Sequence, residues 1–159
     1  MIAPNLCSQS RRTFLKHALL GVGSVAIPHL VSGEERQSLY IDVHTHITQD
    51  FGVKPALSAA ELVRWMDTAE IGKAFVLPLV NPESWDHLIS VEYVLRETEQ
   101  FRGRLIPSCC IDPRMNYLNS VEAKVKHLQR YIDAGVKGYG EHKCGVNIDD
   151  PRNIEVLAA

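Results

Sequence analysis

The sequence has no surplus of basic charge, no long apolar run and no paired-cysteine motif, and each absence argues against one class of protein. Its formal net charge is −2 over 159 residues, which provides no basic field for binding nucleic acid. Its most apolar stretch lies near the N-terminus and is too short and too rich in glycine for a membrane-spanning helix. No C-x-x-C pair occurs, so a structural zinc ribbon is not expected.

The composition that is present is typical of one globular domain, with 45% hydrophobic and 23% charged residues. Four cysteines occur, at Cys7, Cys109, Cys110 and Cys144. Cys7 falls in the leader described below, and the remaining odd number does not indicate a disulfide framework. A single bridge from Cys144 to Cys109 or Cys110 stays open, because these residues fall on predicted neighbouring strands.

Residues 1–33 predict an export signal and are set apart from the fold. The paired arginines Arg11 and Arg12 precede Thr-Phe-Leu-Lys and the apolar run 18–27, and small residues follow at 31–33. This pattern resembles a twin-arginine translocation signal. The resemblance implies a periplasmic protein exported in its folded state, with no stable membrane span after cleavage. An uncleaved N-terminal anchor is the alternative.

Residues 34–159 alternate between strand-like and helix-like segments, which predicts an α/β fold with a parallel sheet. Ser58 and Glu61 form a capping-box pattern that opens the first helix. In the third helix we expect Val121, Val125, Leu128 and Ile132 to form the buried stripe. Strands are predicted at 39–46, 73–80, 104–111 and 136–141, and helices at 58–71, 84–101, 120–134 and 152–159.

Two architectures fit four βα units, namely an open doubly wound sheet and half of a (β/α)8 barrel. The first strand favours the barrel, because alternation puts Asp42, His44 and His46 on one face and Ile41 and Val43 on the other. A barrel strand turns its polar residues inward and packs its apolar residues on helices. A full barrel needs about 250 residues, so we expect a truncated chain, the N-terminal half of a TIM barrel.

One carboxylate and two imidazoles on one strand face are the donors that a divalent metal takes. With this H-x-H at the first strand of a βα series, and Gly-Tyr-Gly-Glu-His-Lys at 138–143, the chain resembles the amidohydrolase superfamily. The resemblance implies that His44 and His46 bind a metal, most plausibly Zn with Mn or Fe as alternatives, and that Glu141 is a further ligand. Asp42 would orient a histidine or another polar partner.

The same resemblance implies the remaining parts of the reaction. Arg114 and Lys143 lie near strand ends and are candidate substrate contacts, with a loop salt bridge as the alternative for Arg114. The general base would be an aspartate on a later strand, beyond the C-terminus, so this chain alone would not turn over.

The expected function is metal-dependent hydrolysis of an amide, ester or lactone bond in a small molecule. A decarboxylase or other lyase on the same barrel is the first alternative. A non-catalytic barrel that binds a metal or ligand is the second. The sequence is compatible with a homo-oligomer and gives no sign of a nucleic-acid partner.

Overall fold

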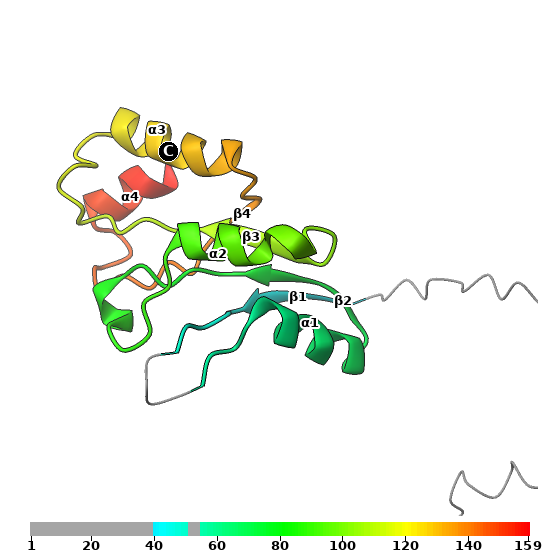
Figure 1. Ribbon diagram of the computed structural model, residues 1–159. Coiled ribbons are helices and arrows are strands. Elements are labelled where there is room, and N and C mark those ends of the chain that lie inside the picture. The colour runs from blue at the N-terminus through cyan, green and yellow to red at the C-terminus, as the bar shows by residue number, and fades with distance from the viewer. Residues whose placement is uncertain (1–39, 51–54) are drawn as a thin grey trace, which may run out of the picture. The chain divides into compact units, whose positions relative to one another are not determined.

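The computed structural model describes residues 40–50 and 55–159, in which strands and helices alternate (Figure 1). The strands are β1 (Tyr40–Thr45), β2 (Ile71–Val76), β3 (Leu105–Cys109) and β4 (Gly138–Tyr139). The helices are α1 (Ala59–Thr68), α2 (Val91–Thr98), α3 (Val121–Asp133) and α4 (Pro151–Leu157), with short 3-10 turns η1 (Pro82–Ser84) and η2 (Glu99–Phe101). The predicted leader, residues 1–33, lies outside the described residues.

The four strands form one parallel sheet in the order β1-β2-β3-β4, so each strand lies beside the next one in sequence. A doubly wound sheet would instead reverse its strand order at a switch point. The helices cover one face. Ala74 and Val76 of β2 and Leu105 of β3 share a buried cluster with residues of both α1 and α2. Sequential strands with helices on one face confirm the predicted α/β half-barrel.

The opposite face of the sheet is packed closely by side chains. Phe75 of β2 and Ser108 of β3 lie against Gly138 of β4 on this inner face. A Cβ atom at Gly138 would lie 2.8 Å from Ser108 Oγ and 3.1 Å from the Phe75 ring. Glycine is therefore the residue that lets the fourth strand approach its neighbours here.

The helix starts follow their capping residues. Ser58 caps α1 with the predicted reciprocal bonds to Glu61, which confirms that capping box. The predicted start of the second helix at Ser84 is wrong, because α2 begins after its N-cap Ser90. The residues between are held by a bridge in which the backbones of Leu79 and Ile89 exchange hydrogen bonds of 2.9 Å.

The buried face of α3 differs from the predicted apolar stripe. Val125 and Ile132 are exposed, whereas Lys124 is buried at 2% relative accessibility. The Lys124 ammonium lies 2.8 Å from the carboxylate of Glu155 on α4. This ion pair compensates the buried charge. Leu128 of the predicted stripe does pack on the core, but Lys124 is buried beside it, whereas Val125 and Ile132 are exposed.

The predicted packing of the first strand on helices is also wrong. Ile41 and Val43 are 55% and 69% exposed. In the described sheet β1 is an edge strand, paired with β2 alone, and its register shifts between Asp42 and Thr45. Such an irregularity disturbs the strict alternation of faces on which the prediction rested.

No helix in the ranges 40–50 and 55–159 is both long and apolar enough to cross a bilayer.

Glu155→Gln should lower the free energy of unfolding by about 1–2 kcal/mol, because it leaves the buried Lys124 ammonium without its counter-charge. The cost is smaller than for a fully buried pair, since Glu155 is partly solvated. Urea unfolding of the full chain measures it. Adding Lys124→Met to Glu155→Gln should restore most of the loss. An unchanged urea midpoint in the single variant would contradict this account.

Candidate metal centre

Three side chains from the two edge strands of the sheet meet at one point. The Glu141 Oε2 atom lies 3.2 Å from Nε2 of His44 and 3.2 Å from Nε2 of His46. The two imidazole Nε2 atoms are 3.3 Å apart. Across a flat four-stranded sheet the edges would be about 14 Å apart, so the contact requires a curled sheet. The structure thus brings together all three residues that the sequence predicted as metal ligands.

The backbone of Leu77, which follows β2, orients the ring of His46. Its Nδ1 lies 2.9 Å from the carbonyl oxygen of Leu77. A carbonyl only accepts, so Nδ1 donates to Leu77, and Nε2 is the ring atom that faces Glu141. This arrangement, with a backbone carbonyl on the outer nitrogen, is common for metal-binding histidines.

The donor set fits a divalent cation. A neutral His46 Nε2 and an ionised carboxylate are both acceptors, so their approach to 3.2 Å needs a proton or a cation between them. For metal–ligand bonds of the length zinc makes, the edge of a tetrahedron is about 3.3 Å. The three separations therefore match one face of such a tetrahedron. The ligand atoms of His44, His46 and Glu141 all lie within 4.8 Å of one another.

Asp42 lies next to this cluster and bonds to backbone. Its Oδ1 accepts the backbone N–H of His44 at 3.0 Å. In the described structure Leu77, not Asp42, holds the ring of a histidine. Asp42 thus supports the strand backbone that carries His44.

His142 follows Glu141 and belongs to a separate polar cluster. Its Nε2 donates to Asn153 Oδ1 at 2.8 Å, and its Nδ1 accepts from the Tyr139 hydroxyl at 2.9 Å. Asn153 Nδ2 donates to the carbonyl of Asn147, which fixes Oδ1 as the acceptor. Sequence reasoning did not find Asn153, because it lies on α4 and has no motif around it.

The cysteines Cys109, Cys110 and Cys144 are free thiols, so the bridge left open by the sequence is not formed. Burial raises the pKa of Cys109 to about 11 and that of Cys110 to about 12. Cys144 Sγ lies 3.3 Å from Asn153 Oδ1 and 3.1 Å from His142 Nε2.

Arg114 is occupied by two carboxylates. Its guanidinium binds Glu83 at 2.8 and 2.9 Å and Asp112 at 2.9 and 2.6 Å. The Arg114 hydrogen bonds lower the pKa of Glu83 to about 2. Burial alone would raise the pKa of Asp112, but hydrogen bonds from Arg114 and Asn81 lower it to about 2. The geometry corresponds to the loop salt bridge that was the alternative to substrate contact.

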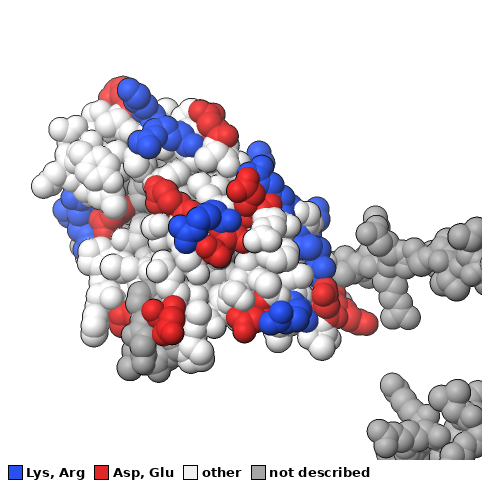
Figure 2. Space-filling model, viewed as in Figure 1, with Lys and Arg blue, Asp and Glu red and all other residues white. Residues whose placement is uncertain are grey.

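Lys143 is exposed and makes no ion pair within the described part of the chain. Lys and Arg lie beside Asp and Glu, with no large patch of one sign, on the face shown in Figure 2.

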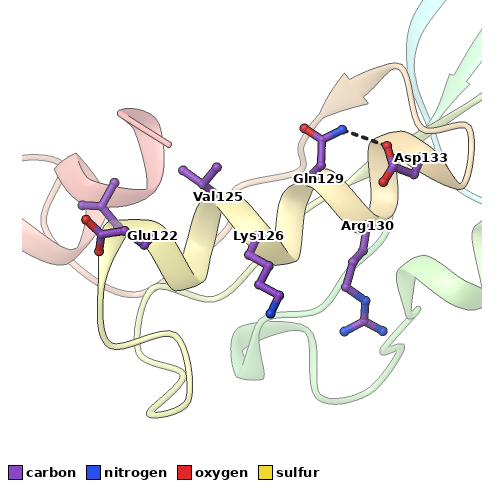
Figure 3. A pocket seen from close by; sticks show the side chains of 7 residues that line it. Glu122, Val125, Lys126, Gln129, Arg130 and Asp133 are labelled. Atoms are coloured by element: carbon purple, nitrogen blue, oxygen red, sulfur yellow. Dashed lines mark hydrogen bonds between the residues drawn. The ribbon is translucent and has the colours of Figure 1, made fainter.

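A hollow of about 600 Å³ runs along α3, lined by Glu122, Lys126 and Arg130 among others (Figure 3). Gln129 donates to Asp133 on its rim at 2.8 Å. None of the three candidate ligands lines this hollow. The candidate site is therefore defined by its convergent donor atoms rather than by this hollow.

No family model and no curated protein matches the chain. Among solved structures, the chain is similar to a probable 2-pyrone-4,6-dicarboxylic acid hydrolase from Acinetobacter baumannii with citric acid bound, at 10% identity and a TM-score of 0.48. The match covers 75% of this chain and 44% of that one.

The Glu83–Arg114 pair should stabilise the fold at neutral pH and be lost in acid. Because the pKa of Glu83 is lowered from 4.5 to about 2, its contribution is present above pH 4.5 and disappears as the pH falls toward 2. The urea midpoint of Glu83→Gln should lie below wild type at pH 6 and converge with it near pH 2. A difference that stays constant from pH 6 to pH 2 would contradict the ion pair.

Proposed function

We propose that the chain carries the first part of a metal-dependent hydrolase site of the amidohydrolase type. The observation that supports it is the convergence of two imidazole nitrogens and one carboxylate oxygen at 3.2–3.3 Å. The ligands follow the first and fourth strands, at the C-terminal ends where barrel active sites are built. The H-x-H resemblance described above agrees with this placement.

A divalent cation held there, with zinc as the first candidate, would supply Lewis acidity toward a water molecule or a substrate carbonyl. The chain's own residues prepare the position. Leu77 fixes the tautomer of His46, and Glu141 contributes one negative charge that offsets part of the charge of the cation. The side chains of Glu141 and His46 are about three-quarters buried, whereas His44 is 58% exposed. The site is therefore open on the side of His44.

Hydrolysis also needs a proton acceptor. The three converging side chains offer their lone pairs to the cation, and Asp42 is engaged with the backbone of His44. Among the described residues, no carboxylate other than Glu141 is paired with the two imidazoles. The expected aspartate on a later strand would fill this role.

A metal-binding barrel without catalysis is the second candidate, because the same three donor atoms would suffice to hold a cation. A lyase on the same barrel would use the same ligands.

Zinc binding tests the proposal directly. The full chain, freed of metal by a chelator, should bind Zn²⁺ in calorimetric titration. His46→Ala and Glu141→Gln should each weaken binding by about 100-fold or more, because each removes a ligand. His87→Asn is the matched control, since His87 lies outside the cluster and pairs with Asp86. Wild-type protein that binds no Zn²⁺, or binding unaffected by the ligand substitutions, would overturn the proposal.

Turnover should separate binding from catalysis. We expect the Zn²⁺-loaded chain of 159 residues to hydrolyse activated esters no faster than His46→Ala, because the proton acceptor is not among the converging groups. An ester hydrolysis rate that a chelator abolishes and that His46→Ala removes would show that the acceptor lies within this chain.

A further inference from the structure

Glu141 lies on a segment that the sheet does not hold. The last backbone hydrogen bond between the chain after β4 and β3 is donated by the Gly140 N–H to the Cys109 carbonyl, at 2.8 Å. The next backbone–backbone bond joins Asp150 to Asn147. Between them, residues 141–146 form no backbone–backbone hydrogen bond with described residues. The position of Glu141 therefore depends on hydrogen bonds that side chains make with this segment.

Two side-chain anchors, at His142 and at Glu83, hold the segment on either side of Lys143, and Cys144 Sγ adds a contact of 3.3 Å with Asn153 Oδ1. On the first side His142 is bound between Tyr139 and Asn153. On the second, Glu83 Oε1 accepts the backbone N–H of Gly145 at 2.8 Å. Glu83 belongs to η1, far away in sequence, so this second anchor ties the loop after β2 to the loop after β4.

Glu83 is itself held rigidly. Both of its carboxylate oxygens accept from Arg114, at 2.8 and 2.9 Å, in the two-pronged geometry that orients a carboxylate best. Arg114 is in turn bound to Asp112, whose side chain is 5% exposed and also accepts from Asn81 at 3.1 Å. Glu83 is thus held, through Arg114, by the buried side chain of Asp112.

The approach of Glu83 to the loop is close enough to restrict the residue there. A Cβ atom at Gly145 would overlap the Glu83 Oε1 atom and lie 3.2 Å from its Cδ. An alanine at this position would displace the carboxylate or the loop. Gly145→Ala therefore perturbs the same contact as a change at Glu83, but from the other side.

We propose that Glu83 is a positioning residue for the metal centre: held by Arg114, it fixes Gly145 and through it the segment that presents Glu141 to His44 and His46. This inference rests on the proposed function for its metal-binding consequence. The anchoring of the segment by Glu83 does not depend on a metal.

Two variants test the anchor. Glu83→Met keeps the side-chain length and removes both acceptor oxygens, whereas Gly145→Ala retains the Glu83 carboxylate and crowds its contact with the loop. Each should weaken Co²⁺ binding by the full chain about tenfold, the lower range for a residue that supports a metal ligand. Each should also alter the visible absorption bands of bound Co²⁺. Glu83→Gln retains an acceptor oxygen and should restore part of the affinity.

Asp67→Asn is the matched control. Asp67 pairs with Arg104 at 2.8 Å, next to the start of β3 and away from the metal centre. This variant loses an arginine–carboxylate pair and should leave the Co²⁺ affinity and spectrum unchanged. If Asp67→Asn lost as much Co²⁺ affinity as Glu83→Met, the loss in Glu83→Met would reflect general destabilisation of the fold. That result would overturn the inference.

Hydrogen–deuterium exchange of the metal-free chain provides the second readout. Amides of residues 141–146 should exchange faster in Glu83→Met and Gly145→Ala than in wild type or Asp67→Asn. If wild type binds no Co²⁺, the proposed function fails, and exchange alone then decides whether Glu83 anchors the segment. If wild type and both variants bind Co²⁺ equally with one spectrum, the inference fails while the metal site stands. Unchanged exchange in both variants also overturns the inference.

Discussion

The contact of Glu141 with His44 and His46 depends on the curvature of the sheet. These residues follow the two edge strands, and the edges can face each other only if the strands between them bend around a common axis. The curved sheet packs against helices on its outer face and is filled by side chains around Gly138 on its inner face. A flatter sheet would keep every strand and helix of the chain and lose the site.

Local patterns carried most of what the sequence could predict. The order of strands and helices follows from hydrophobic periodicity, and the capping box at Ser58 involves residues three apart. His44 lies in β1 and His46 follows its last residue, so their spacing alone placed them together. The start of α2 and the buried face of α3 were mispredicted because distant contacts decide them. The Lys124–Glu155 pair spans 31 positions, and no periodicity in α3 indicates it.

Charged residues near the strand ends were harder to interpret than the histidines. Arg114 was a candidate for substrate contact, yet its guanidinium is shared between Asp112 and Glu83. Asp112 lies two positions away and was visible in the sequence, whereas Glu83 lies 31 positions away and was not. The sequence also predicted Glu141 beside the histidines, but it could not show how a segment outside the ladder is held there.

The packing of Phe75 and Ser108 against Gly138 limits the direction from which the candidate metal centre can be reached. These side chains fill the inner face on the N-terminal side of the candidate metal centre, along the direction of the strands. They form a floor below the three donor atoms, so a water molecule or ligand could not travel up to them between these strands.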